Sequence, residues 1–202
     1  MNKKIITVFI ICLIIIVFIS LYFFLNNRKN SDNYYNSSIK EEKYLVVYFS
    51  AQNHTKNVAN KIAKNLNADT FEIIPKEKYT SDDLDWTNEN SRVSKEHNDK
   101  SLRNIELETI KIDNFYSYDV VLIGYPIWWG EAAWPINTFV KNTDFTGKKV
   151  IPFCTSASSG IGNSDKILEK LTKSGTWKKG KRFSSNPSLK DIKLFTDEIK
   201  SN

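Results

Sequence analysis

The sequence predicts an α/β domain in which helices cover both faces of a parallel β-sheet. Short apolar runs rich in strand-forming residues recur between residues 44 and 183, as expected of strands that are buried on both faces. Segments with apolar residues at helical spacing lie between these runs. Strands that alternate with helices form a parallel sheet, and right-handed crossovers leave few possible topologies.

An apolar segment precedes this domain. Residues 5–25 are 21 residues without a charge, after a basic flank at residues 1–4, and such a length crosses a hydrocarbon core of about 30 Å. Residues 1–33 contain no Ala or Gly, which disfavours cleavage of a signal peptide. We therefore expect an uncleaved transmembrane helix at 5–25 and a single-pass membrane protein.

The charges beside this segment bear on its orientation. Basic residues stand at both of its ends, and a first helix with basic residues at its start usually keeps the N-terminus inside. We expect the main domain on the extracytoplasmic side. Residues 26–43 are polar and low in complexity, which is typical of a flexible linker. The remaining 159 residues, 44–202, have the size of one domain.

The first half of the domain gives clear signals only at its start. Residues 44–49 form a continuous apolar run, and a helix with its apolar face on residues 58–66 follows a short polar loop. Residues 71–74 resemble a short strand that Pro75 ends. Residues 80–99 are polar and acidic, and a loop of this length is unusual unless it is functional. We expect some helix within 91–108 and a solvated surface position for His97.

The second half alternates regularly. Residues 119–125 predict a buried strand, residues 126–130 a turn, and Pro135 the first turn of a helix that Gly147 closes. Residues 149–154 predict a further strand, followed by a Ser/Gly loop and a helix around 167–171. A short fifth strand is expected at 182–183. Ser188 and Asp191 resemble a capping box that opens a last helix reaching Ile199.

Three polar or aromatic loops follow the strands that end near residues 49, 125 and 154. Ligands of parallel sheets bind beyond the carboxyl ends of the strands, so we expect these loops to share one site. The first loop leads directly into a helix, whose N-terminus is suited to an anion. No Lys or Arg lies within it, which favours one phosphate held by neutral donors and excludes a Walker lysine pattern. The alternative is an ordinary N-cap by Thr55.

The second and third loops add a planar ligand to this picture. Adjacent side chains at Trp128 and Trp129 point in different directions, so one can offer a flat ring for stacking; a hydrophobic plug is the alternative. Residues 155–160 supply small side chains and backbone N–H groups, although a flexible turn has the same composition. A phosphate, a stacked ring and polar edge contacts together describe flavin mononucleotide (FMN).

These motifs resemble those of the flavodoxin family. The matching segments are Ser50 to Thr55, Gly124 to Trp129 and Thr155 to Gly160, with an Asp-Leu-Asp-Trp stretch at 83–86. The resemblance implies a flavodoxin-like three-layer sandwich with a five-stranded parallel sheet of order 2-1-3-4-5. One departure is that Gln52 and Asn53 replace the usual inner Thr and Gly, and Asn tolerates a left-handed backbone better than most residues.

The resemblance also implies the residues that contact FMN. The phosphate would lie at the first loop, and the isoalloxazine ring would lie between the second and third loops. The residues expected at the phosphate are Ser50, Gln52, Asn53, His54 and Thr55. Those expected at the ring are Pro126, Ile127, Trp128, Trp129, Gly130, Thr155, Ser156, Ala157, Ser158, Ser159 and Gly160.

Three functions remain open on the sequence alone. The first is electron transfer to a redox partner protein. The second is an FMN-dependent NAD(P)H:quinone-type oxidoreductase, in which the acceptor is a small molecule such as a quinone. The third is a binding or hydrolytic domain without flavin, for which His54, Ser158 and Asp165 would form a triad, although no nucleophile elbow is present.

The charge distribution and the two cysteines argue against a nucleic-acid site, a metal site and a disulfide framework. The net charge of +6 divides evenly between residues 1–33 and the rest, and the basic cluster in residues 170–182 is typical of a solvated face rather than a nucleic-acid site. Of the two cysteines, Cys12 lies in the apolar segment and Cys154 in the domain. The sequence shows no spacing of metal ligands, so we expect no metal and no disulfide framework.

Overall fold

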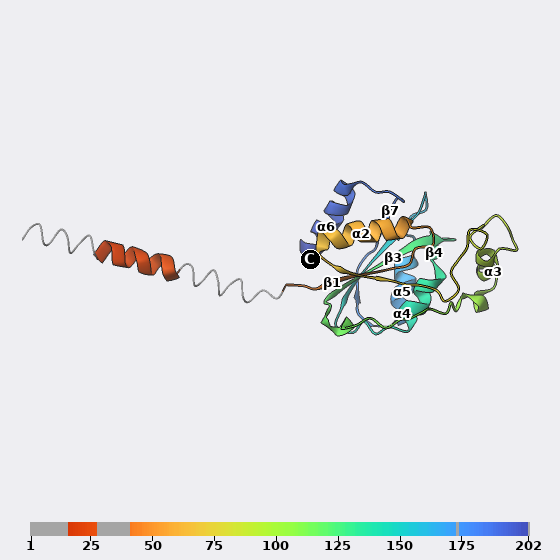
Figure 1. Cartoon of the computed structure of the whole chain (residues 1–202), viewed down its shortest axis with the longest axis horizontal. Helices are drawn as coiled ribbons and strands as arrows, with labels where there is room; N and C mark the ends of the chain where they lie inside the picture. The colour runs from red at the N-terminus through yellow and green to blue at the C-terminus, as the bar shows by residue number, and fades with distance from the viewer. Residues whose placement is uncertain (1–15, 28–40, 173, 202) are drawn as a thin grey trace, which may run out of the picture. The chain divides into compact units, whose positions relative to one another are not determined.

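The computed structural model describes residues 16–27, 41–172 and 174–201 (Figure 1). The chain divides into two compact units, residues 1–41 and residues 42–202. Residues 16–27 are helical and expose their apolar side chains. Within the described residues, no helix has both the length and the apolarity that crossing a membrane requires. The flank 1–4, much of the expected anchor 5–25 and most of the expected linker 26–43 lie outside the described residues.

One sheet of seven strands forms the centre of the second unit. Its main path has the order β2-β1-β3-β5-β6, and every pairing along that path is parallel. The prediction of a parallel α/β sheet is therefore confirmed. The strands are β1 (Tyr44–Tyr48), β2 (Asp69–Glu72), β3 (Val120–Trp128), β4 (Glu131–Ala132), β5 (Lys149–Thr155), β6 (Thr176–Trp177) and β7 (Lys181–Phe183).

The prediction of five strands is wrong, for two local reasons. The first is that β3 continues through residues 126–128, where we expected a turn, and folds back as the two-residue antiparallel strand β4. The second is that the fifth strand is divided into β6 and β7, which both pair with β5. Pro152 of β5 has no N–H to donate to the neighbouring strand. Gly180 lies beside Pro152, and its N–H donates to the Asp165 carboxylate at 3.1 Å instead of to a carbonyl of β5.

Helices cover both faces of the sheet (Figure 1). One face packs against α2 (His54–Leu66) and α6 (Leu189–Ser201), and the other against α4 (Trp134–Lys141) and α5 (Ser164–Thr172). Successive strand residues alternate between the two cores, so that Val46 packs with α2 while Val47 packs with α4. Burial on both faces explains why the strands are continuous apolar runs in the sequence.

Element boundaries differ from the expected ones at a few places. Strand β2 begins at Asp69 rather than at residue 71. Helix α4 ends at Lys141, so Gly147 does not close it. Gly147 instead has a φ of 77° in the turn before β5, where the Thr146 N–H donates to Asp144 at 2.9 Å. The helix at the C-terminus begins as expected, because the Asp191 N–H donates to Ser188 Oγ at 3.1 Å.

The polar segment between β2 and β3 forms a closed excursion. Its base is an antiparallel bridge between Pro75 and Leu107, with the Lys76 N–H bonded to the Glu106 carbonyl at 2.9 Å. The excursion, residues 76–106, contains α3 (Arg92–Asn98) and the 3₁₀ turn η1 (Lys100–Arg103), within the range where helix was expected. A second 3₁₀ turn, η2 (Phe115–Ser117), lies after the excursion and immediately before β3.

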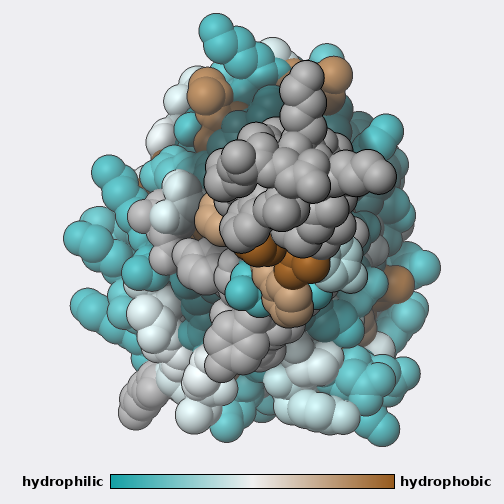
Figure 2. All heavy atoms as spheres, turned by 90° about the vertical axis from the view of Figure 1, so that its left-hand side faces the viewer, coloured by the Kyte–Doolittle hydropathy of each residue, from teal (hydrophilic) through white to brown (hydrophobic). Residues whose placement is uncertain are grey.

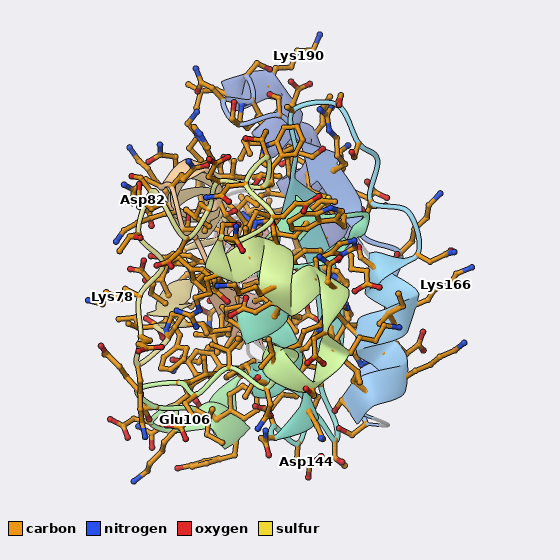
Figure 3. The ribbon with its side chains drawn as sticks, turned by 90° about the vertical axis from the view of Figure 1, so that its right-hand side faces the viewer. Lys78, Asp82, Glu106, Asp144, Lys166 and Lys190 are labelled. Atoms are coloured by element: carbon orange, nitrogen blue, oxygen red, sulfur yellow. The ribbon has the colours of Figure 1, made fainter. Side chains whose placement is uncertain are left out.

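The excursion lies at the end of the domain toward which β1 and β3 run (Figure 1). Seen from that side, α3 stands in front of the sheet, and charged side chains such as Lys78, Asp82 and Glu106 point outward (Figure 3). Where the surface of the domain is visible from the opposite side, most of its residues are hydrophilic (Figure 2). The carboxyl end of the sheet is therefore the end that carries additional structure.

Close contact between β3 and β5 leads to the first prediction. A Cβ atom at Gly124 would lie 2.2 Å from Phe153 Cζ, in the middle of the sheet. We expect Gly124→Ala to lower the free energy of unfolding by about 1–3 kcal/mol, because the ring of Phe153 must move within a packed core. Urea unfolding followed by circular dichroism measures this. Gly160→Ala is the matched control, since its Cβ would have no neighbour closer than 3.9 Å; equal stability of both variants would contradict the packing argument.

Candidate functional site

A cavity of about 630 Å³ opens at the carboxyl ends of β1, β3 and β5. The three loops singled out in the sequence meet there. The first loop also contributes Ala51, and residues outside the three loops add Leu84, Trp86, Val93 and Ser185. Of the expected site residues, Asn53, Gly130 and Gly160 lie outside the lining, and the following lie within it: Ser50, Gln52, His54, Thr55, Pro126, Ile127, Trp128, Trp129, Thr155, Ser156, Ala157, Ser158 and Ser159.

The first loop presents an open helix N-terminus to this cavity. Asn53 is the N-cap of α2 with a φ of 62°, and its side chain makes no capping hydrogen bond. The left-handed conformation foreseen for the first loop therefore occurs at Asn53, outside the cavity lining. The first-turn N–H groups of α2 thus keep their capacity to bind an anion. Thr55 is not the N-cap: it is buried within the first turn, with Oγ1 2.8 Å from Oγ1 of Thr155.

The polar groups of this loop are neutral. Ser50 Oγ is buried and has no hydrogen-bond partner among the described residues, although its residue lines the cavity. The nearest lysine in sequence, Lys56, is engaged elsewhere, because its Nζ lies 2.7 Å from the Glu72 carboxylate. No Asp, Glu, Lys or Arg occurs among the described residues that line the cavity.

The second loop is a tight hairpin that separates the two tryptophans. Trp129 and Gly130 are its central residues, and both have positive φ, 46° and 77°, as in hairpin turns of type I′. Trp128 is half-buried at the end of β3 and meets the rings of Phe49 and Tyr79 edge to face, at 5.7 and 5.1 Å between centroids. Trp128 is therefore part of an aromatic cluster, whereas Trp129 is 40% exposed at the tip.

His97 meets Trp129 at this tip. The imidazole and indole centroids are 4.4 Å apart, and the ring planes differ by 9°. The expectation of a solvated His97 is therefore wrong. The reason is tertiary: the excursion places α3 beside the hairpin, and no local pattern in residues 91–108 could indicate which residue would face Trp129.

The third loop is braced from outside the cavity. The Ser156 N–H donates to the Phe183 carbonyl at 3.2 Å, and Ser156 Oγ donates to the Ser159 carbonyl. Arg182 donates to the carbonyls of Ser156 and Ala157, each at 2.8 Å. The sequence places Arg182 in a basic cluster, so its role in holding this loop was missed. Only its position in the predicted fifth strand, beside the strand that leads into the third loop, could have indicated this role.

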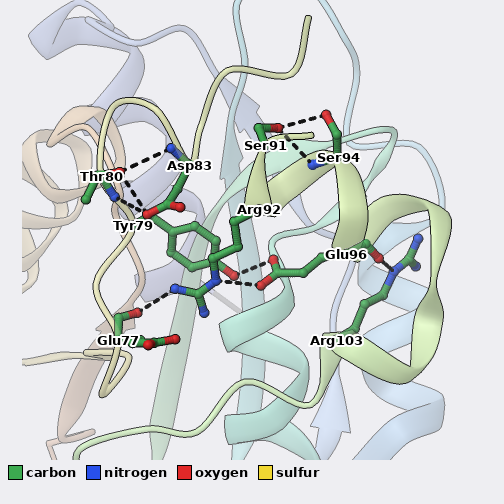
Figure 4. A network of polar contacts seen from close by, with 9 residues as sticks. All are labelled: Glu77, Tyr79, Thr80, Asp83, Ser91, Arg92, Ser94, Glu96 and Arg103. Atoms are coloured by element: carbon green, nitrogen blue, oxygen red, sulfur yellow. Dashed lines mark hydrogen bonds and ion pairs between the residues drawn. The ribbon is translucent and has the colours of Figure 1, made fainter. Parts of the chain in front are cut away.

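A polar network joins residues within the excursion to one another (Figure 4). The carboxylate of Glu96 is buried and accepts from Tyr79 at 2.6 Å and from Arg92 at 2.8 Å. The guanidinium of Arg92 also lies 4.0 Å from the centroid of the Tyr79 ring. Burial and the bond to Glu96 raise the pKa of Tyr79, so the phenol remains a donor. This acidic segment is therefore ordered by an ion pair and hydrogen bonds within the excursion.

Three other chemistries find little support in the geometry of the described residues. Asp165 accepts from the N–H groups of Gly180 and Lys166, and no bond joins it to His54 or Ser158 within the described part of the chain. Burial raises the pKa of Cys154 to about 12, so its thiol stays neutral and unreactive near neutral pH. Across residues 16–27, 41–172 and 174–201, no three His, Cys, Asp or Glu side chains gather in a way that would hold a metal ion.

Comparison with known proteins identifies a family and several solved structures that are similar to this chain. The family model described as flavodoxin matches residues 43–199. A crystal structure of a candidate flavoprotein from Bacteroides eggerthii is 42% identical and covers 78% of this chain and 98% of its own, with a TM-score of 0.70. A second candidate flavoprotein, from Bacteroides uniformis, is 40% identical and covers 78% and 99%, with a TM-score of 0.71.

More distant structures share the fold. Oxidised flavodoxin 2 from Bacillus cereus is 16% identical over 79% of this chain and 99% of its own, with a TM-score of 0.50. Among curated proteins, none matches the chain with significant similarity.

Proposed function

The chain belongs to the flavodoxin family, and from this membership we propose that it binds FMN and transfers electrons to a redox partner. The observation that carries the proposal is the buried hydroxyl of Ser50, a residue that lines the cavity, because this hydroxyl has no hydrogen-bond partner among the described residues. A buried polar group without a partner is costly. A phosphate oxygen at the first loop would accept its hydrogen bond.

The rest of the first loop fits the same group. An anion at the start of α2 would meet N–H groups that no side chain caps. Gln52, His54 and Thr55 line the cavity beside them. Because the lining holds no Lys or Arg, the phosphate would be held by neutral donors and the helix dipole. These features suit the single terminal phosphate of FMN.

The isoalloxazine ring would lie between the second and third loops. Trp129 and the small residues of the third loop line the cavity. The indole would offer a flat face for stacking, and the small side chains would let a planar edge approach backbone N–H groups. FMN, when bound, supplies the redox-active ring. The protein would bind its phosphate, orient its ring and exclude water from its apolar face by Trp128 and Ile127.

The direct experiment is a titration of the purified protein with FMN, riboflavin and FAD. We expect FMN to bind most tightly, because only FMN presents one terminal phosphate to the first loop. Ser50→Ala should weaken FMN binding by about 5- to 30-fold, which corresponds to about 1–2 kcal/mol for a hydrogen bond to a charged group. Riboflavin affinity should change less than about twofold, since riboflavin has no phosphate.

The same variant separates binding from folding. The Ser50 hydroxyl has no partner within the described protein, so Ser50→Ala removes an unsatisfied buried group and should not lower the free energy of unfolding of the ligand-free protein. Ser184→Ala is the control, since Ser184 is exposed and outside the cavity lining. A loss of riboflavin affinity equal to that of FMN would show that the first loop is not the phosphate site.

The quinone-reductase function remains the second candidate. Trp86 is 71% exposed and lines the cavity mouth, where it could meet either a protein partner or a second planar molecule. An exposed aromatic at a rim is typical of protein contacts, which favours the carrier. We expect the FMN-loaded protein to oxidise NADH and NADPH in the presence of a quinone no faster than free FMN does. Stopped-flow absorbance measures this, and a saturable, enzyme-dependent rate would establish the oxidoreductase instead.

We further propose that the N-terminal segment tethers the domain to a membrane as a single pass, with the domain on the extracytoplasmic side. The support is the uncharged run of residues 5–25 and the exposed apolar side chains of the described helix. The full chain should stay with membranes after alkaline carbonate extraction, whereas a chain of residues 42–202 should be released. Release of both would contradict the tether, and protease protection in sealed vesicles reports the orientation.

A further inference from the structure

We propose that His97 is a positioning residue that holds Trp129 as one wall of the flavin site. The inference rests on the proposed function and adds to it that the excursion of residues 76–106, and not the hairpin alone, fixes this wall. The observation behind it is the stack of the two rings, with centroids 4.4 Å apart and planes within 9° of each other.

Trp129 needs such a support. It stands at the tip of a two-residue turn with a φ of 46°, a conformation that is unfavourable for any residue except Gly, Asn or Asp. Trp128 next to it contacts the rings of Phe49, Tyr79 and Trp134. Within the described residues, His97 is the aromatic ring that packs against Trp129. Without His97, the exposed indole would be free to take other rotamers.

A second link joins the same two elements. The Arg103 guanidinium donates to the carbonyls of Glu96 and His97, both at 2.6 Å, and to the Glu131 carboxylate at 2.9 Å. Glu131 follows the hairpin turn directly, so one side chain ties the end of α3 to the start of β4. Arg103 also lies 4.0 Å from the centroid of Trp134, which is fully buried. Arg103 therefore links the backbone of His97 to the buried ring of Trp134.

The stack leaves one face of the indole for a ligand. An indole has two faces, His97 covers one of them, and Trp129 lines the cavity. Planar aromatic groups stack with favourable energy in offset geometry. The isoalloxazine ring would then be the third layer of an imidazole–indole–isoalloxazine stack. In this arrangement His97 acts on the flavin only through Trp129.

The test compares ring replacements at position 97 in the full chain, with FMN and riboflavin as probes. His97→Ala and His97→Leu should each weaken both flavins equally, by about 3- to 10-fold, because the wall contacts the ring and not the phosphate. His97→Phe keeps a flat ring and should bind within about twofold of the parent. Lys95→Ala, an exposed change on the same helix, is the matched control and should bind like the parent.

A double-mutant cycle identifies the route of the effect. In a Trp129→Leu background, His97→Ala should cause no further loss of flavin affinity, since its effect passes through the indole. Urea unfolding of each variant separates a loss of the fold from a loss of the wall, and His97→Leu keeps the buried volume if His97→Ala is unstable.

Several results would overturn the inference while FMN binding by the parent still stands. They are unchanged affinity in His97→Ala, equal affinity in the Leu and Phe variants, additive losses in the double mutant, or a loss for FMN that riboflavin does not share. Absence of FMN binding by the parent protein is a different result, and it would overturn the proposed function itself.

Discussion

The parallel register of β1, β3 and β5 is the constraint on which the site depends. Gly124 of β3 is paired with Tyr48 on one side and Phe153 on the other, so the three strands end at the same edge. Gly124 leaves room for the Phe153 ring in the middle of the sheet. Because backbone pairing fixes this edge, three loops that are about 75 and 30 residues apart along the chain converge on one cavity.

The excursion between β2 and β3 adds part of the cavity wall, which the sheet alone does not provide. Its core is a buried carboxylate, Glu96, satisfied by Tyr79 and Arg92. A buried ion pair contributes little net stability, but removing one of its two partners is costly. Such a pair is better suited to fixing one arrangement than to strengthening the fold. Here the arrangement that it fixes includes the cavity wall, since α3 carries Glu96, His97 and the carbonyls that Arg103 binds.

The sequence predicts the sheet, its helices and the convergence of the loops, because these follow from periodicity and from the rule for carboxyl ends. It also predicts that the first loop can hold a left-handed residue, at Asn53. It does not predict the division of the fifth strand, which depends on Pro152 lying opposite Gly180. Nor does it predict the stack of His97 on Trp129 or the bracing by Arg182, because each joins elements whose pairing is set only by tertiary structure.

Strand β1 begins where the chain enters the domain and runs toward the cavity, so these two features lie at opposite ends of the strand. The chain enters at Glu42, where the Lys43 N–H bonds the Asp119 carboxylate at 3.0 Å, and the cavity lies past the other end of the strand. A strand of five residues spans roughly 16 Å at about 3.3 Å per residue. A pulling force on the chain before Glu42 would therefore act on the pole opposite the cavity mouth. Docking at the mouth and restraint at the entry point would not compete for the same surface, so immobilising the domain through its N-terminus would leave the mouth free for exchange.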